Sequence, residues 1–202
     1  MAATRARKKK GSSEPRGAAA TGWLVLVYKV PSEPSRVRVS VWRELKRLGG
    51  LYLQQAACIF PALPETAQAL HKVRQRISSL GGTSYYFEVP PQPEDEHAVL
   101  VSGFQQASAK EYAEIVEECE TKFVKEIEFE RFRSNYTFEE AEEIRQDLEK
   151  IRRWYEKVVA RDWFGGPGRD EVVRWLEKCE ALLEAFEEDV YKTTSEEDEA
   201  AP

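Results

Sequence analysis

The chain has 202 residues, of which 42% are hydrophobic and 11% aromatic, so it can bury a core and is not wholly disordered. It carries 30 lysine and arginine residues against 36 aspartate and glutamate residues, and no apolar run is long enough to predict a transmembrane helix. Three widely spaced cysteines and a basic N-terminus without an apolar signal segment favour a cytoplasmic protein.

Charge is divided unevenly along the chain. Residues 1–88 carry 15 basic and 5 acidic side chains, whereas residues 89–202 carry 15 basic and 31 acidic ones. The basic half predicts contact with a polyanion, although long solvated helices are also rich in glutamate. Residues 1–21 are predicted to form a disordered basic arm and residues 193–202 a disordered acidic tail, because neither has a periodic apolar pattern.

Residues 22–103 are predicted to form one compact domain with six elements. Apolar and aromatic runs predict the strands, while apolar stripes that end at paired glycines predict the helices. The expected elements are strand 23–30, helix 35–48, strands 51–54 and 57–60, helix 64–80 and strand 84–89. This order is the ferredoxin-like βαββαβ pattern, an antiparallel sheet with two helices on one face. A further short strand is expected over residues 97–103.

Residues 104–192 are predicted to be a helical extension. Capping boxes begin at Ser108 and Thr137, and a Gly-Pro loop at 165–168 separates two apolar seams with heptad spacing. The seams consist of Ala141, Ile144, Leu148, Ile151, Tyr155 and Val158, then of Val172, Trp175, Cys179, Leu182, Phe186 and Val190. Two such seams predict an antiparallel helical hairpin beside a third long helix. The predicted class is α+β, a ferredoxin-like domain followed by this extension.

Basic side chains gather on the two helices of the first domain. Arginines on the first helix recur at helical spacing opposite its valine–leucine stripe, and guanidinium groups in register can hold phosphates through forked hydrogen bonds. The candidate phosphate-binding residues are Arg36, Arg43, Lys46, Arg47, Lys72 and Arg76. An ordinary solvated helix face would have a similar composition. Trp42, on the same helix, is expected to be a core anchor rather than a residue on which a base stacks.

Signals for catalysis are weak. The chain has no nucleophile elbow, zinc-protease motif, phosphate-binding loop or dinucleotide motif. Adjacent carboxylates such as Glu139 and Glu140 point in different directions on a helix and are expected at the surface. His71 is expected on an exposed helix face and His97 in a loop. We therefore expect no enzyme, metal or cofactor, and cysteines that act as small buried hydrophobes.

Three segments together resemble a known family. The run 23–61, the segment 135–158 and the motif ARDWFG at 160–165 resemble the N-terminal domain of ChrB, the regulatory protein of chromate resistance. The resemblance covers roughly residues 22–191. It implies a regulator that binds operator DNA and responds to chromate. Full-length family members have a further C-terminal domain, which this chain is expected to lack, so that a separate sensor protein could complement it.

The start of the chain is also similar to the CRISPR-associated integration nucleases and to the middle domain of the phenylacetate-degradation repressor. The nuclease resemblance implies a metal-binding aspartate at the end of the first strand. This strand ends Tyr28-Lys29-Val30, and a lysine cannot replace a carboxylate ligand of Mg²⁺. The departure argues against metal-dependent cleavage.

Three functional hypotheses follow. The first is a cytoplasmic, dimeric regulator of the ChrB type that contacts duplex DNA through the basic helix face and the basic arm. The alternative is a non-catalytic protein-interaction module built on the acidic helical hairpin, which would leave an apolar stripe exposed on that hairpin. The third is a nuclease that uses other carboxylates. The sequence identifies neither an operator nor an effector.

Overall fold

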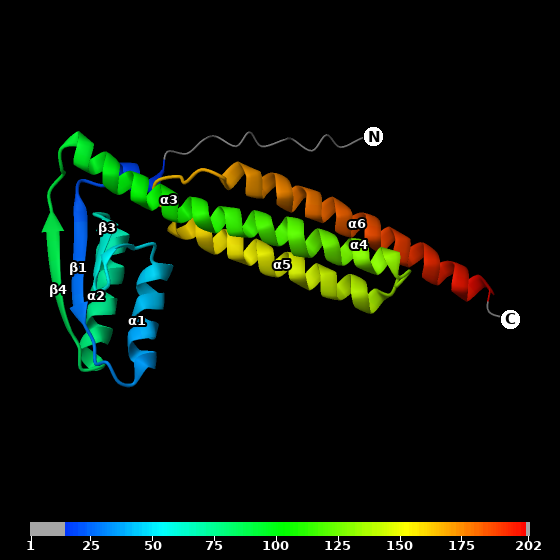
Figure 1. Ribbon diagram of the computed structural model, residues 1–202, viewed down its shortest axis with the longest axis horizontal. Helices are drawn as coiled ribbons and strands as arrows, with labels where there is room; N and C mark the ends of the chain where they lie inside the picture. Colours follow the sequence, from blue (N-terminus) through cyan, green and yellow to red (C-terminus); the bar gives the residue numbers. More distant parts are fainter. Residues whose placement is uncertain (1–14, 201–202) are drawn as a thin grey trace, which may run out of the picture.

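The computed structural model describes residues 15–200, and the side chains of residues 15–195 (Figure 1). The elements are η1 (Arg16–Ala19), β1 (Trp23–Lys29), α1 (Ser35–Arg47), β2 (Leu51–Gln54), β3 (Ala57–Pro61), α2 (Pro64–Ser79), β4 (Thr83–Val89), α3 (Glu94–Glu118), η2 (Cys119–Phe123), α4 (Val124–Phe132), α5 (Phe138–Arg161) and α6 (Arg169–Ala200). The sheet and its two short helices lie at one end, and three long helical rods extend from it.

The two predicted disordered ends need correction where the structure describes them. Most of the basic arm, residues 1–14, lies outside the described residues. The remainder includes the 3-10 helix η1, in which the Gly17 amide donates to the Trp163 carbonyl at 2.7 Å. At the other end, α6 continues through the predicted acidic tail to Ala200, because its glutamate-rich turns have good helix propensity.

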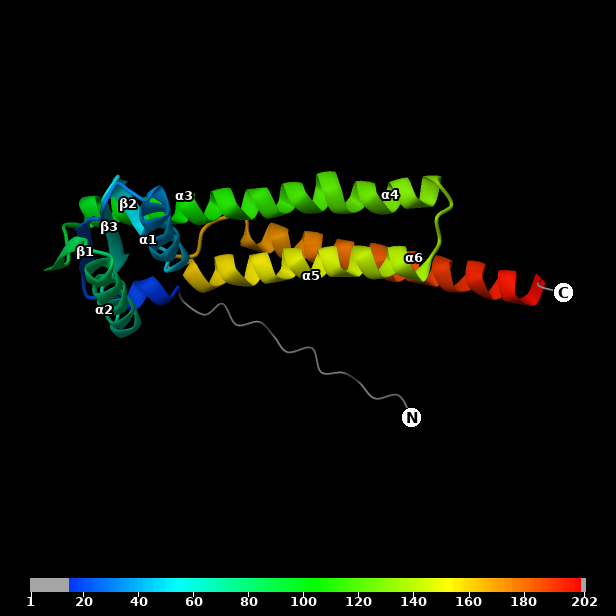
Figure 2. The ribbon, with the colours of Figure 1, turned by 90° about the horizontal axis from the view of Figure 1, so that it is seen from below.

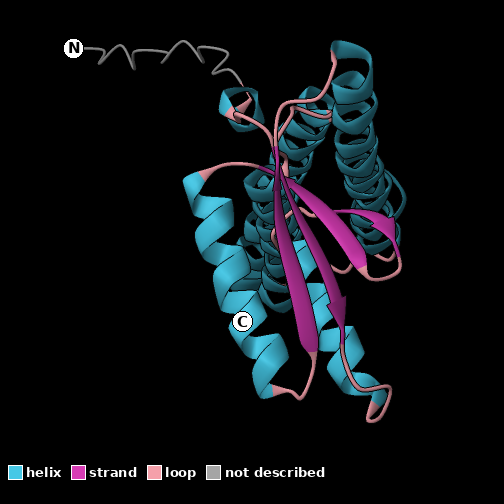
Figure 3. Cartoon of the chain, turned by 90° about the vertical axis from the view of Figure 1, so that its left-hand side faces the viewer, coloured by secondary structure: helices cyan, strands magenta, loops and turns pink. Residues whose placement is uncertain are grey.

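The predicted βαββαβ order is confirmed. The four strands form one antiparallel sheet in the order β2-β3-β1-β4, so the central strand β1 pairs with both β3 and β4. Residues 36–42 (RVRVSVW) alternate between polar and apolar side chains, which is also typical of a strand. They nevertheless lie in the first helix, which begins at Ser35, so its apolar stripe outweighs this alternation. Figure 3 shows the strands in front of α1 and α2, both of which cover the far face of the sheet.

The alternation of β1 divides its side chains between the two faces of the sheet. Leu24, Leu26 and Tyr28 point towards α1 and α2, where they join a buried cluster. On the other face, Phe87 pairs with Val25 and remains 52% exposed. Helices α1 and α2 therefore bury one face of the sheet, while the other face is buried around Trp23 and Ile59 and keeps Phe87 at the surface.

The expected strand at 97–103 is wrong, because these residues lie in helix α3. Pro93 precedes the helix and three acidic residues occupy its first turn, where they interact favourably with the helix dipole. Phe104 is buried against Trp23, with ring centroids 5.9 Å apart. The helix crosses the predicted domain boundary at 103/104, so the two regions share one continuous element.

The helical extension is a three-helix bundle. The rod formed by α3, the π-helical η2 and α4 runs away from the sheet, α5 returns, and α6 runs outward again (Figure 2). The predicted hairpin is confirmed, and its seams pack against the third helix. In α6, Leu176 and Leu183 are buried more deeply than the predicted Trp175 and Leu182. At these two positions the more deeply buried residue is therefore the one that follows the predicted residue in the chain.

Candidate functional site

A cavity of about 950 Å³ lies between α1 and α3, beside the end of α5. We call it the α1–α3 cleft. Six basic and two acidic side chains line it, so its wall carries a net positive charge. These residues are Arg43, Lys46, Arg47, Arg76, Lys110, Arg161, Glu111 and Glu114. The volume falls in the usual range of ligand pockets, and the charge favours an anionic ligand.

The amphipathic character of α1 explains why it presents cations to the cleft. Val41 and Leu45, one helical turn apart, are fully buried against the sheet. Arg43, Lys46 and Arg47 fall on the other side of the helix and are exposed. The pattern that anchors α1 on the sheet therefore also directs its basic residues outward.

The cations of the cleft differ in how far they are neutralised. Arg76 forms an ion pair with Glu44, and Arg161 forms a two-bond pair with Glu111, in which its Nε donates to Oε1 at 3.1 Å. Four other lining cations have no ion-pair partner among residues 15–195. They are Arg43, Lys46, Arg47 and Lys110. Their charge is left to interact with solvent ions or with a bound anion.

Trp42 also lines the cleft, which corrects the expectation that it anchors the core. Its side chain is 44% exposed, whereas its neighbour Val41 is fully buried. Tryptophan normally buries most of its ring, so an exposed ring beside several cations is a notable surface feature. The buried tryptophans of the molecule are Trp23 and Trp163, among the described residues.

The structure brings together four of the six predicted phosphate-binding residues. Arg43, Lys46, Arg47 and Arg76 line the cleft. Arg36 and Lys72 are exposed on the same two helices but do not line it. Sequence reasoning missed Lys110 and Arg161, since both come from the helical extension. For Arg161, the one signal in the sequence was its position in the motif ARDWFG at 160–165.

The motif Arg161-Asp162-Trp163-Phe164 forms a joint between the sheet region and the bundle. Asp162 is buried, and its carboxylate accepts hydrogen bonds from the Tyr112 hydroxyl at 2.9 Å and from the Gly166 amide at 3.0 Å. Burial, followed by the nearby Asp162 charge, raises the pKa of Tyr112. Tyr112 therefore keeps its proton and remains a donor to Asp162.

The joint also holds the C-terminal end of α1. Trp163 Nε1 donates to the Leu48 carbonyl at 3.1 Å. Gly49 follows with a φ of 75°, and a Cβ at that position would lie 2.4 Å from the Arg161 carbonyl oxygen. Only glycine combines this backbone conformation with so close an approach. The joint thus fixes Arg161 next to the arginines of α1.

Comparison with known proteins accounts for the combination of sheet region and bundle. Residues 38–197 match the family described as Protein ChrB, N-terminal, a span that includes every charged residue of the cleft. The chain belongs to the ChrB N-terminal family. Over 94 residues it is 30% identical to Protein ChrB of Cupriavidus metallidurans. That alignment covers 46% of this chain and 28% of the relative, so the chain matches well under half of the relative's length.

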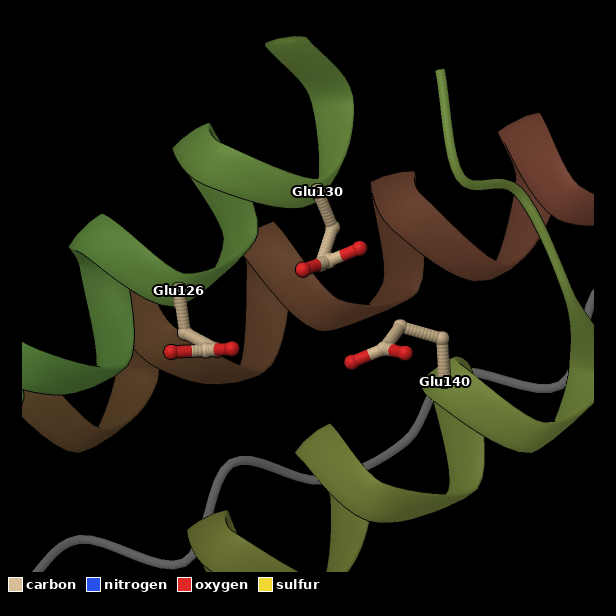
Figure 4. A group of neighbouring side chains, drawn as sticks. All are labelled: Glu126, Glu130 and Glu140. Carbon is tan, nitrogen blue, oxygen red and sulfur yellow. The ribbon is translucent and has the colours of Figure 1, made fainter. Parts of the chain in front are cut away.

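This ChrB N-terminal family member also has an acidic cluster at the far end of its bundle (Figure 4). Carboxylate oxygens of Glu126 and Glu130 from α4 and of Glu140 from α5 lie within 4.8 Å of one another. Asn135 Nδ2 donates to Glu130 at 2.6 Å and to Glu140 at 3.2 Å, and Arg133 lies 3.5 Å from Glu130. Partial burial, followed by the neighbouring carboxylates, raises the pKa of Glu140. Asn135 and Arg133 therefore already contact carboxylates of this cluster.

The histidines and cysteines add no second reactive centre within the described residues. His71 is exposed as predicted and contacts only Gln75, at 3.2 Å, among the side-chain hydrogen bonds of residues 15–195. The predicted loop position of His97 is wrong, because it lies in α3 with its ring centroid 5.2 Å from that of Trp23. Cys119 and Cys179 are buried, as expected, and Cys58 is buried as well. Among residues 15–200, no helix is long and apolar enough to cross a membrane.

Proposed function

We propose that this chain is a non-catalytic, cytoplasmic transcriptional regulator that holds duplex DNA through phosphate contacts at the α1–α3 cleft. Membership of the ChrB N-terminal family links it to chromate resistance. The observation that carries the DNA-binding proposal is the set of four cleft cations without an ion-pair partner in residues 15–195. Such cations are available to replace the counterions of a phosphate backbone.

The mechanism begins with the guanidinium groups of Arg43 and Arg47, which can each donate two parallel hydrogen bonds to a phosphate. Lys46 and Lys110 add point charges on either side. The glutamate-rich bundle repels the same backbone, so the charge distribution orients the cleft towards DNA. These contacts position the protein, and sequence selectivity requires additional contacts to base edges or a response to DNA shape.

The proposal is tested by fluorescence anisotropy with labelled duplex from the upstream region of the chain's own gene, against a scrambled duplex, at several salt concentrations. We expect selective binding that weakens steeply with salt. The double variant Arg43→Ala/Arg47→Ala should reduce the slope of log K against log salt by about 2, since each lost phosphate contact removes roughly 0.9.

The matched control is Arg152→Ala/Arg153→Ala, which removes the same charge from α5. These residues pair with Glu180 at 2.7 Å and Glu149 at 3.2 Å, and neither of them lines the cleft. The control should keep the wild-type slope. Equal slopes for the cleft variant and the wild type would exclude the cleft as the DNA-binding surface.

The proposal includes a homodimer, because a two-fold protein matches a two-fold operator. The sequence would allow a dimer through the sheet edges or through the helical hairpin, but the seams of the hairpin are buried within the bundle, and we favour the open face of the sheet. Tyr85 and Phe87 on the open sheet face are 64% and 52% exposed. Light scattering should show a dimer that Phe87→Asp converts to a monomer, whereas a wild-type monomer at working concentration would contradict this part.

A second candidate function is docking of a protein partner, such as a separate sensor, at the far end of the bundle. The apolar stripe that was predicted to be exposed along the hairpin does not support this function, because the seams of the hairpin are buried in the bundle. Instead, Phe132 and Phe138 beside the turn between α4 and α5 are 86% and 63% exposed. A photo-crosslinking residue at position 132 should capture such a partner in cells, and one at position 153 should not. Equal capture at both positions would exclude a specific site at the tip.

A further inference from the structure

The α1–α3 cleft combines an exposed aromatic ring with cations, and a phosphate-binding surface alone does not need the ring. Trp42 is 44% exposed and lines the cleft beside Arg43. The flat face of an indole is a platform on which any nucleobase can stack, while neighbouring arginines hold the phosphates on either side of that base. Ring and cations together match the two chemical parts of a nucleotide.

The shape of the cleft narrows the choice of ligand. In a perfect duplex the bases are stacked inside the helix, and only their edges are accessible from the grooves. A cavity of about 950 Å³ also has room for a single nucleotide that leaves the stack, beside the backbone phosphates that the proposed function places at its arginines. An unpaired nucleotide can swing out of the duplex at a lower cost than a paired one.

The cleft also provides a hydrogen-bond acceptor. Glu111 is occupied by Arg161, whereas Glu114 lines the same cavity and has no ion-pair partner among residues 15–195. A carboxylate accepts hydrogen bonds from the exocyclic amino group of a base, as in the pairing of glutamate with cytosine N4. Thymine lacks this amino group, so the cleft should discriminate against it.

We infer that the α1–α3 cleft binds a single unpaired nucleotide of a DNA duplex, with the base stacked on Trp42 and the flanking phosphates held by Arg43 and Arg47. Glu114 accepts from the amino group of the base. This inference rests on the proposed function, because the same arginines contact the backbone in both. It adds a preference for duplexes that contain an unpaired, amino-bearing base.

The test uses the full chain and four labelled duplexes that are identical except at one central position. They carry no bulge, a dC bulge, a dT bulge or an abasic bulge. Base stacking predicts that the wild type binds the dC-bulged duplex about tenfold more tightly than the perfect or abasic one. The dT bulge should give an intermediate affinity.

Three substitutions isolate the parts of the site. Trp42→Ala should reduce the ratio of bulged to perfect affinity to about 1, and Trp42→Phe should retain most of it. Glu114→Gln should lower the discrimination between dC and dT. Phe132→Ala is the matched control, since it removes another exposed aromatic side chain from the opposite end of the bundle, and it should keep the full preference.

The inference and the proposed function fail in different ways. A wild-type protein that binds bulged and perfect duplexes equally, or a Trp42→Ala variant that keeps the tenfold preference, overturns the inference. The proposed function fails separately, if Arg43→Ala/Arg47→Ala leaves the salt dependence of perfect-duplex binding unchanged. Circular dichroism of each variant confirms that the exposed substitutions leave the fold intact.

Discussion

Helices α1 and α5 are both rich in arginine, but they use it in opposite ways. Each arginine of α5 forms an ion pair: Arg145, Arg152, Arg153 and Arg161 have partners on their own helix, on α6 or on α3. The four arginines of α1 form no ion pair with any residue from 15 to 195. Partnered arginines hold helices together, and unpartnered ones are available to a ligand.

The difference follows from the composition of the neighbouring elements. Helix α5 lies between helices rich in glutamate, so every arginine finds a carboxylate within reach. Helix α1 has only Glu44 among its own residues, and Arg76 occupies it. An exposed ion pair contributes about 0.2 to 1 kcal/mol to stability. The protein therefore forgoes little stability by leaving the α1 cations unpaired.

Removing the buried carboxylate of the joint should have the largest effect. We expect Asp162→Ala to destabilise the protein by about 3 kcal/mol, because it leaves the Tyr112 hydroxyl and the Gly166 amide without an acceptor. The melting temperature should fall by roughly 6 to 12 °C. Urea titration measures the free energy of unfolding of both variants. Asp147→Ala, which removes an exposed pair with Lys150, should cost less than about 1 kcal/mol.

Gly49→Ala tests whether the joint is needed to position α1. It should cost about 2 kcal/mol through the positive φ and the contact with the Arg161 carbonyl. Gly81→Ala is a close control, since Gly81 has the same φ of 75° but the added Cβ would lie 3.9 Å from its nearest neighbour, Pro31. The excess destabilisation of Gly49→Ala measures the contact itself. Equal costs would show that the joint tolerates the extra methyl group.

Single arginine substitutions compare the two helices directly. Arg145→Ala removes ion pairs with Glu187 and Glu142 and should cost up to about 1 kcal/mol. Arg43→Ala should leave the free energy of unfolding unchanged within error and should weaken DNA binding instead. The comparison between α1 and α5 breaks down if Arg43→Ala is the more destabilising of the two.

The smallest effect is expected at the acidic cluster. The raised pKa of Glu140 means that the folded state disfavours its charged form, so this group lowers stability as the pH rises through its pKa. Glu140→Gln should therefore stabilise the protein at neutral pH by about 0.5 kcal/mol or less. The gain should disappear in acid, where the carboxyl groups are protonated. A gain that persists at low pH would assign the effect to packing rather than charge.

The sheet region was largely predictable because local signals agreed with one another. The apolar run of β1, the glycine pairs after α1 and α2 and the aromatic β4 all pointed to the observed order. The error at residues 97–103 has a physical cause. Once β4 completed the sheet, His97 and Phe104 could bury their rings against Trp23 from a helix. These contacts join residues that are far apart in the sequence, so the local pattern of residues 97–103 does not indicate them.

Only the part of the site that lies on helix α1 was predictable from the sequence. Arg43, Lys46 and Arg47 follow from the periodicity of α1 alone. Lys110 and Arg161 join them because the joint brings α3 and α5 to that helix, which is a contact between residues far apart in sequence. Trp42 was misplaced for a related reason. Its helix position allows either burial or exposure, and the occupied core decides between them.

The continuous rod of α3, η2 and α4 gives the molecule a lever arm. It spans residues 94–132, which corresponds to a length of about 55 Å at the rise of a helix. The α1–α3 cleft meets the rod at Ala107, Lys110 and Glu114, between a third and a half of the way along it, and the acidic cluster lies near its far end. A tilt of about 5° at Lys110 moves the tip at Phe132, about 33 Å further along the rod, by roughly 3 Å. A small change of angle beside the cleft is thereby amplified into a larger displacement at the tip, the place proposed above for a docked partner.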